Sequence, residues 1–452
     1  MFILLATGLT SFITYIGARL IEKTEKEEKR KGRLLLSGFV AIILGFLVFV
    51  KLYTFNGWTL SFFIVPVGIS YYTFSLISYL ADVYWKRDQA ERNYFKLALF
   101  VLFFPKILQG PISRHRYLSV QLLQGNRFSF KNISFGSQLI IWGLFKKLVI
   151  ADRAVILVNN VYGNLADYRN SGAILCVVMV FSAIQLYCDF SGYTDMARGI
   201  SQMFGICLEE NFNHPFFAKS SGEFWQRWHM TLSGWFKDYL FLPISRSKYV
   251  KKISKSAGKR FGATARKNTI IIIASSIVWL ATGLWHGTGI NYVVWGAYWG
   301  FLIIFSEVFA PQIEKVNNFL RINTQAATWK WFQMLRTFGI FCVGKMISAQ
   351  DNLQEVKLII RAIIKSLNPS ELLTGKIYEL GLSRANIYVL VFGLIILWGT
   401  SLLQEKGCIR EKIADWNMIP RCIFYGLSIL TVILFSVYGS GYDTSTFAYQ
   451  FF

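Results

Sequence analysis

Long apolar runs alternate with short polar stretches from one end of the chain to the other. A run of about 18 to 20 apolar residues has the length of an α-helix that spans a membrane. The first run, Met1 to Leu20, lacks the basic start and the small-residue cleavage site of a secretory signal, so it predicts a retained membrane anchor. The other runs are Leu34–Tyr53, Leu60–Leu80, Lys96–Leu108, Gly136–Val158, Ala173–Asp189, Asn268–Leu284, Val293–Phe309, Phe332–Ile347, Ile387–Leu403 and Ile419–Tyr438.

These runs predict an all-α integral membrane protein with about ten to twelve membrane segments, several of them too short to span and therefore re-entrant. The composition agrees with this class. Of the 452 residues, 54% are hydrophobic and 16% are charged, whereas about a quarter are charged in soluble domains. Because the apolar runs leave no stretch for a separate soluble core, we expect one polytopic domain over residues 1–452.

The formal net charge is +23, and the basic residues concentrate in short loops between the apolar runs. Such loops face the cytoplasmic leaflet, so the pattern predicts membrane lipids as partners and argues against nucleic acid. The densest basic loop, residues 246–267, holds nine Lys and Arg side chains and no acid. We expect this loop to be cytoplasmic and to anchor the topology on lipid. A docking surface for an acidic carrier or a nucleotide-bearing donor is the alternative.

His286 is the first candidate for chemistry. It lies between two apolar runs, where Gly283, Gly287 and Gly289 would loosen or break a helix. Irregular backbone at membrane depth is tolerated only inside protein or beside a water-filled cavity, and an ionisable side chain there indicates a functional site. The alternative is a core histidine bonded to a backbone carbonyl.

His229 is the second candidate. Ser220 and Glu223 have the spacing of a capping box, so a helix is predicted to begin there. The side chains on one face of that helix would be Trp225, Trp228, His229, Leu232 and Phe236. This arrangement directs His229 inward, although an aromatic belt at the membrane interface is the alternative. Gln226 and Arg227 would leave this face and could bind a charged donor or a lipid headgroup.

Two acids, Asp189 and Asp195, close one of the apolar runs. Their separation is too long for one helical turn, although Gly192 between them is expected to allow a bend. Because a buried charge needs a partner, we expect these acids to orient a histidine or to pair with an arginine such as Arg198 or Arg227. A paired-carboxylate acid/base system is the alternative.

The remaining histidines are expected to have no role in chemistry. His214 lies in a polar turn that begins at Asn211, and His115 follows a Gly-Pro pair and is expected at the surface. The six cysteines show neither Cys-x-x-Cys nor Cys/His spacing, so we expect no metal site.

The sequence contains no nucleophile elbow, Walker motif, Rossmann fingerprint or His-Glu-x-x-His motif. A buried histidine without a nucleophile partner suits general-base catalysis, in which it takes a proton from a hydroxyl that attacks an activated acyl group. The competing class is a transporter whose buried histidines relay protons or bind substrate.

Five motifs, taken together, resemble the membrane-bound O-acyltransferase (MBOAT) family. The resemblance is closest to the bacterial branch that O-acetylates surface polysaccharides such as alginate and peptidoglycan. The motifs occur in family order in a core of residues 60–310. They are Phe103 to Arg114, Asp189 to Ala197, Asn211 to Pro215, Phe224 to Leu232, and Gly283 to Gly287.

The resemblance implies a many-helix fold around a tunnel that crosses the bilayer. An acyl thioester would enter from the cytoplasm and a hydroxyl acceptor from the other side. The family's invariant histidine corresponds to His286, the implied general base, and its second characteristic histidine to His229, which would polarise or position donor or acceptor. The implied supporting or substrate-binding residues are Asp189, Asp195, Asn211, Trp225, Gln226, Arg227, Trp228 and Trp285.

The implied donor is acetyl-CoA, used as a substrate with no bound cofactor, and the implied acceptor is an exported polysaccharide at the bacterial cell membrane. In this branch a separate extracytoplasmic transferase often takes the acyl group onward. A sister branch passes D-alanine from a carrier protein toward teichoic acids. That branch usually lacks the Asp-Phe-Ser-Gly-Tyr-Thr-Asp form found at residues 189–195, so acetyl transfer is favoured. Members of the favoured branch usually carry one more apolar segment before the one at Phe2, so we expect this chain to start late relative to them.

Overall fold

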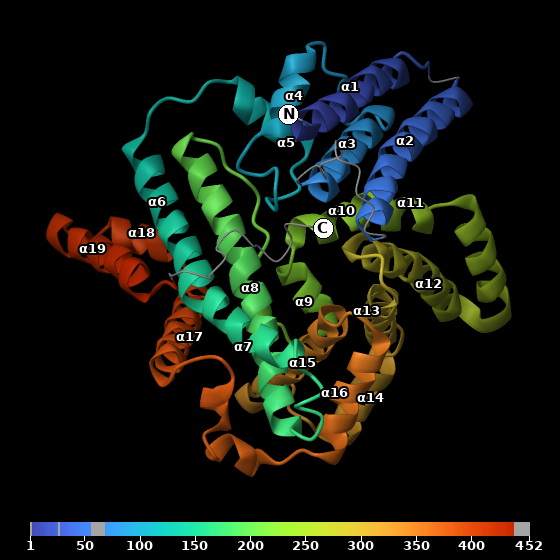
Figure 1. Cartoon of the computed structure of the whole chain (residues 1–452). Helices are drawn as coiled ribbons and strands as arrows, with labels where there is room; N and C mark the ends of the chain where they lie inside the picture. Colours follow the sequence, from blue (N-terminus) through green and yellow to red (C-terminus); the bar gives the residue numbers. More distant parts are fainter. Residues whose placement is uncertain (1, 26–27, 56–67, 438–452) are drawn as a thin grey trace. The chain divides into compact units, whose positions relative to one another are not determined.

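The computed structural model describes residues 2–25, 28–55 and 68–437, and these residues form helices joined by short connections (Figure 1). Within these ranges the only β-structure is an isolated antiparallel bridge between Phe212 and Trp228. The predicted all-α class is therefore confirmed. The first residues of the predicted run Leu60–Leu80, and the end of the run Ile419–Tyr438, lie outside the described residues.

Contacts divide the chain into two compact units. Of the described residues, the first unit contains those up to 140 and residues 193–210, and the second contains residues 141–192 and 211–437. The helices that begin in the first unit are α1 (Phe2–Glu22), α2 (Lys29–Phe55), α3 (Ile69–Tyr84), α4 (Tyr94–Leu102), α5 (His115–Leu123) and α6 (Phe130–Leu144). A single domain over residues 1–452 stays a prediction.

In the second unit, the π-helical turn η1 (Phe145–Ala151) continues α6. The elements up to the kinked α12 are α7 (Asp152–Tyr162), α8 (Gly172–Met203), η2 (Pro215–Phe217), α9 (Ser221–Arg227), α10 (Met230–Phe236), η3 (Lys237–Phe241), α11 (Leu242–Ser245) and α12 (Lys248–His286). The remaining elements are α13 (Ile290–Val308), α14 (Ala310–Phe319), α15 (Ala327–Ala349), α16 (Leu353–Lys365), η4 (Pro369–Leu373), η5 (Lys376–Glu379), α17 (Arg384–Gln404), α18 (Ile409–Ala414) and α19 (Met418–Phe435).

Five helices in the described part of the chain are long and apolar enough to cross a membrane, judged by length and composition. They are α2, α8, α12, α17 and α19. α13 and α14, which meet at an angle of 64°, would form a sixth span if the bent pair crosses as one. The multi-pass membrane character is therefore confirmed. The other predicted segments include short helices such as α4, which has nine residues and is too short to span.

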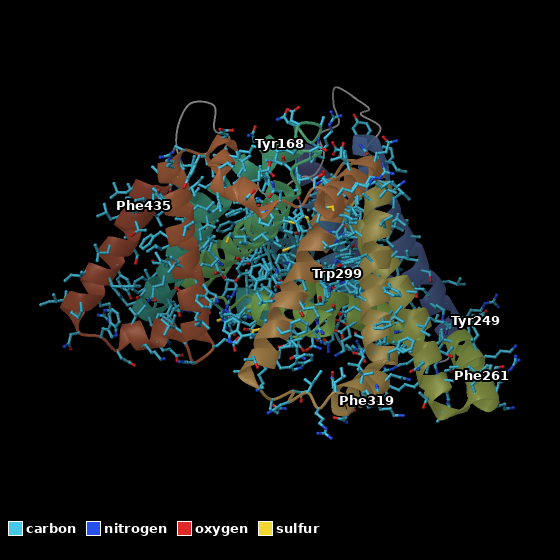
Figure 2. All side chains as sticks on the ribbon, turned by 90° about the horizontal axis from the view of Figure 1, so that it is seen from below. Tyr168, Tyr249, Phe261, Trp299, Phe319 and Phe435 are labelled. Atoms are coloured by element: carbon cyan, nitrogen blue, oxygen red, sulfur yellow. The ribbon has the colours of Figure 1, made fainter. Side chains whose placement is uncertain are left out.

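The basic stretch 246–267 is helical, so its prediction as a loop is wrong. Most of it forms the first part of α12, where the Ser247 hydroxyl accepts a hydrogen bond from the backbone N–H of Val250 at 3.3 Å. Gly262, with φ 89° and ψ 177°, is the one non-helical residue inside α12. Lysine, arginine and alanine favour a helix, so only this glycine interrupts it. Figure 1 shows the two arms of α12 meeting at a sharp bend, and Figure 2 labels the exposed Tyr249 and Phe261 on the basic arm. Its cytoplasmic location stays a prediction.

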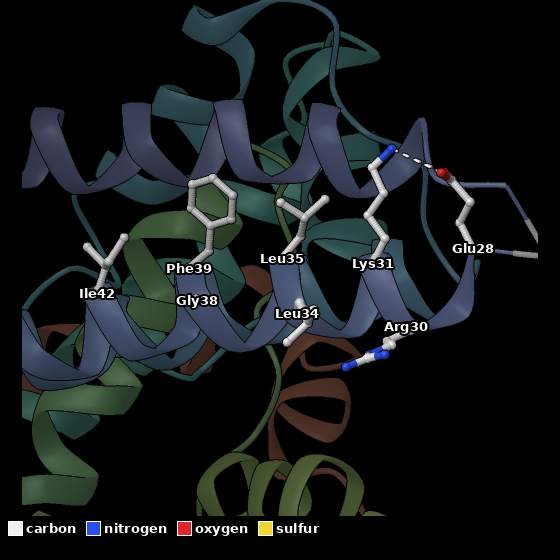
Figure 3. A pocket seen from close by; sticks show the side chains of 8 residues that line it. All are labelled: Glu28, Arg30, Lys31, Leu34, Leu35, Gly38, Phe39 and Ile42. Carbon is white, nitrogen blue, oxygen red and sulfur yellow. Dashed lines mark hydrogen bonds and ion pairs between the residues drawn. The ribbon is translucent and has the colours of Figure 1, made fainter.

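In the first unit, α2 carries an open apolar groove of about 590 Å³. Leu34, Leu35 and Phe39 line it, and an ion pair between Lys31 and Glu28, 3.1 Å long, closes its end at the start of the helix (Figure 3). Apolar side chains on the outer face of a spanning helix match the hydrocarbon of the bilayer.

In the second unit, α12 and α13 pack against each other through glycines. A Cβ atom at Gly283 would lie 2.5 Å from the carbonyl oxygen of Tyr292, and one at Gly296 would lie 2.5 Å from the carbonyl oxygen of Trp279. Small residues of this kind allow helix backbones to approach closely inside a membrane. This contact fixes the end of α12 that carries His286.

We predict that Gly296→Ala lowers the free energy of unfolding by about 1–3 kcal/mol, because the added methyl group meets rigid backbone. The thermal unfolding midpoint in detergent measures this effect. Gly399→Ala is the matched control, since no atom lies within 4 Å of its added Cβ, and it should leave the midpoint unchanged or raise it. Equal midpoints for the two variants would contradict the packing argument.

Candidate active site

The predicted helix start at Ser220 is confirmed. The Ser220 hydroxyl accepts a hydrogen bond from the backbone N–H of Glu223 at 3.1 Å. The Glu223 carboxylate in turn accepts one from the backbone N–H of Lys219 at 2.8 Å. The first bond satisfies an N–H group in the first turn of α9 that has no partner within the helix, and the second ties the Glu223 side chain to the residue before the cap.

The helix from Ser220 does not continue through His229, so the predicted single face of tryptophans and histidine is wrong. α9 ends at Arg227, His229 adopts a left-handed backbone with φ 46° and ψ 51°, and α10 begins at Met230. The physical reason is a competing backbone pairing with residues 211–213. The backbone N–H of Asn213 donates to the carbonyl of Arg227 at 2.9 Å, and that of Met230 donates to the carbonyl of Asn211 at 3.0 Å.

The Asn211 side chain completes this pairing. Asn211 is buried, and its Oδ1 accepts hydrogen bonds from the backbone N–H of Thr231 at 3.2 Å and from the Thr231 hydroxyl at 2.6 Å. The carboxamide therefore holds the first turn of α10, directly after His229.

The His229 ring lies inside an aromatic pocket of the second unit. His229 is 1% exposed, and its ring meets Phe190 edge-on with centroids 4.8 Å apart and Trp285 with centroids 6.2 Å apart. His229 lies outside the candidate spans. Burial disfavours the charged imidazolium and lowers the pKa of His229 to about 3, so the ring is neutral at physiological pH.

His286 is the last residue of α12 and is 6% exposed. Its ring centroid lies 4.7 Å from that of Trp285 and 4.7 Å from that of Trp295. Gly287 follows in an extended conformation, and a Cβ atom there would lie 2.1 Å from the ring of Tyr292. Trp285 thus contacts both histidines, and the structure brings His229 and His286 to one buried aromatic site.

Tryptophans from separate helices form the wall of this site. Trp225 lies 4.9 Å from Trp279 and 5.1 Å from Trp299, which Figure 2 labels, measured between ring centroids. Trp228 lies 4.8 Å from Phe341 of α15. The predicted members Trp225 and Trp228 are both buried here. Such a wall excludes water and strengthens electrostatic interactions inside it.

Sequence comparison supports the motifs. Residues 86–349, more than half of the chain, match the family described as MBOAT, membrane-bound O-acyltransferase family. This chain belongs to the membrane-bound O-acyltransferase family. Its buried Trp-His-Gly turn and its second buried histidine both lie within the matched residues.

Within this family, the chain is similar to bacterial acyltransferases whose names refer to polysaccharides of the cell surface. The chain is 33% identical to the probable alginate O-acetylase AlgI of Pseudomonas syringae over 64% of this chain and 50% of that protein. It is 30% identical to the peptidoglycan O-acetyltransferase of Helicobacter pylori over 67% of this chain and 60% of that protein. It is 28% identical to the teichoic acid D-alanyltransferase of Bacillus subtilis over 51% of this chain and 56% of that protein. The chain therefore spans about half to three fifths of the length of these relatives.

The two acids of α8, Asp189 and Asp195, have separate partners. α8 runs through Gly192 as one helix, so the expected bend is wrong. A Cβ atom at Gly192 would lie 2.8 Å from the carbonyl oxygen of Gly143, which explains the glycine by close packing rather than by a bend. Asp195 pairs with Arg198 at 3.5 Å, in the first unit, as expected.

Asp189 pairs with a lysine, so the prediction that it orients a histidine or pairs with an arginine is wrong. Its carboxylate lies 2.7 Å from Nζ of Lys147, which also lies 2.9 Å from the carboxylate of Asp152. All three side chains are buried. A cation between two carboxylates offsets the cost of burying each charge.

Arg227 and Gln226 lie at the edge of the site. The Arg227 guanidinium pairs with Glu223 at 3.0 Å and with Glu405 at 2.9 Å. Gln226 is exposed, in agreement with its expected departure from the aromatic face. A role for either residue in binding the donor or a lipid headgroup stays a prediction.

The other two histidines have different surroundings. His115 is 6% exposed and its Nδ1 lies 2.8 Å from the carboxylate of Asp88, so its prediction as a surface residue is wrong. The hydrogen bond to Asp88 gives the buried ring a polar partner. His214 adopts a left-handed backbone with φ 45° and, with Trp331 and Trp398, lines an apolar pocket of about 280 Å³. The described residues contain no group of three or more His, Cys, Asp and Glu side chains that could hold a metal ion.

Three residues of the arrangement were missed in the sequence. Trp295 contacts His286, Phe190 contacts His229, and Lys147 pairs with Asp189. The signal for Trp295 was its helical spacing from Trp299 after the glycine-rich turn. The signal for Lys147 was a lysine pair inside an apolar run, where a buried cation requires an acid.

We predict that His229 stays neutral between pH 5 and 8, because burial lowers its pKa. Selective 15N labelling of the four histidines, with His229→Gln to assign the signal, measures this by NMR in detergent. The His229 resonance should not shift across this range. A shift with a midpoint near the ordinary value of about 6.5 would contradict the burial of this ring.

Proposed function

We propose that this protein is an O-acyltransferase that moves an acetyl group from a cytoplasmic thioester, acetyl-CoA, toward hydroxyls of an exported polysaccharide. The observation that carries the proposal is the placement of His286 and His229 on one buried tryptophan, Trp285, in a member of the MBOAT family. The names of the acetylating relatives support a polysaccharide acceptor.

The proposed reaction is a direct acyl transfer. The His286 imidazole takes the proton of the acceptor hydroxyl while its oxygen attacks the thioester carbonyl carbon. The tetrahedral intermediate collapses with loss of the thiolate, and the protonated His286 returns the proton to sulfur. Neutral His229 donates an N–H to the carbonyl oxygen, where negative charge develops. The ester and the free thiol are the only products.

The supporting residues have distinct tasks in this proposal. Trp225, Trp228 and Trp285 exclude water, which would otherwise hydrolyse the thioester. Asn211 holds the backbone that presents His229. Asp189 neutralises Lys147.

The remaining assignments concern the edge of the site and the route across the membrane. Gln226 and Arg227 would contact the donor at the edge of the site. Asp195 would orient the guanidinium of Arg198, which also pairs with Glu210 at 2.6 Å. The proposal includes a tunnel that admits the thioester from the cytoplasm and the acceptor from the other side. It also includes an extracytoplasmic partner transferase that takes the acyl group onward.

Transfer of D-alanine from a carrier protein is the second candidate, and the likeness to the teichoic acid D-alanyltransferase favours it. The two candidates share the histidine chemistry and differ in the donor. A test with free acyl-CoA substrates therefore separates them.

We predict that the purified protein in nanodiscs, supplied with alginate or peptidoglycan fragments as hydroxyl acceptors, releases CoA from acetyl-CoA but not from a long-chain acyl-CoA. His286→Ala should lower the rate about 10²- to 10⁴-fold. A thiol-reactive dye follows the release. His214→Asn is the control, because asparagine tolerates the left-handed backbone found there and His214 has no role in the proposed chemistry.

Two results would contradict the acetyl-CoA proposal. Turnover of a carrier-bound D-alanyl thioester, with none of acetyl-CoA, would favour the second candidate. Parent-level turnover in His286→Ala, or no thioester cleavage at all, would remove the general-base role and favour the transporter class.

A further inference from the structure

A pair of buried amides lies at the start of α13, next to the turn that carries His286. Asn291 is the second residue of α13, and its Nδ2 donates a hydrogen bond to the backbone carbonyl of Gln350 at 2.7 Å. Gln350 is the residue at which the chain leaves α15 in an extended conformation. Both residues are 3% exposed. One hydrogen bond thus joins the His286 turn to the end of α15.

Both helices contribute to the wall of the histidine site. On α13, Asn291 is followed after one turn by Trp295, which contacts His286. On α15, Phe341 contacts Trp228. Gln350 therefore lies where two elements that line the site converge.

The Gln350 carboxamide has an unused donor. Its Nε2 is buried and has no hydrogen-bond partner among the described residues. An unsatisfied buried donor costs about 1–3 kcal/mol, so proteins rarely keep one without a use. An acceptor supplied by a bound molecule would satisfy it.

We propose that Gln350 is a substrate-binding residue of the His286 site, where its amide N–H donates to the carbonyl oxygen of the acyl group and Asn291 holds it in position. This inference rests on the proposed acyl transfer. The thioester carbonyl oxygen gains negative charge as the acceptor oxygen attacks, and a fixed donor is worth most at that moment. Gln350 itself neither gains nor loses a proton.

Gln350→Met is the decisive variant, because methionine has nearly the same shape and removes only the polar atoms. We expect kcat for CoA release from acetyl-CoA to fall about 10²- to 10³-fold with KM little changed. The thermal midpoint should stay level or rise, because the unpartnered donor is gone. Gln333→Met, on the same helix, is the matched control and should retain the parent kcat.

Two further variants separate donation from shape. Gln350→Glu keeps the shape, and burial raises the pKa of its carboxyl, so the neutral acid can still donate while the ionised carboxylate cannot. Its kcat relative to the parent should therefore fall as the pH rises. Asn291→Ala leaves Gln350 in the chain but removes the bond that positions it, so kcat should fall less far and the midpoint should drop.

The outcomes separate this proposal from the proposed function. Parent-level kcat in Gln350→Met, together with loss of activity in His286→Ala, would overturn the role of Gln350 and leave acyl transfer intact. A loss of kcat in Gln350→Met with a lowered midpoint would show a structural role and overturn the proposal. A parent protein that cleaves no thioester would overturn both.

Discussion

Backbone hydrogen bonding at the break between α9 and α10 is the constraint on which the site depends. Peptide groups away from water need partners inside the protein. Residues 211–213 supply those partners, and the Asn211 carboxamide adds two more bonds to Thr231. A left-handed backbone at a histidine costs about 1–3 kcal/mol, which these bonds offset. The pairing therefore turns His229 out of a regular helix and into the aromatic pocket that holds Trp285.

Buried ion pairs fix the position of α8 against the π-helical turn η1. Lys147, on the π-helical turn η1, lies between Asp152 and Asp189, and Lys345 of α15 interacts electrostatically with Asp189 as well. Removal of one partner would leave an uncompensated buried charge, which costs several kcal/mol. Asp189 immediately precedes Phe190, which packs on His229. The charges thus stabilise a helix position and need no proton transfer of their own.

The parts of the site that depend on local sequence were predictable, and those that depend on distant partners were not. Ser220 starts a helix because its cap bond is formed three residues away, and the glycines after His286 indicated a helix end. The break at His229 escaped prediction because residues 211–213, which pair with it, are separated from it in sequence by α9. His115 looked exposed because its partner, Asp88, lies far away in sequence. Gln350 belongs to no sequence motif. Its position beside α13 depends on a hydrogen bond to Asn291, 59 residues away, and therefore could not be predicted from the sequence.

The central claim is that His286 and His229 act on one reacting group. A double-mutant cycle on CoA release from acetyl-CoA tests it, with His286→Ala, His229→Ala and the combined variant compared at equal folded fraction. If both rings serve one transition state, the combined loss should be much smaller than the product of the two single losses. Single losses that multiply in the double variant would show independent roles and contradict the account.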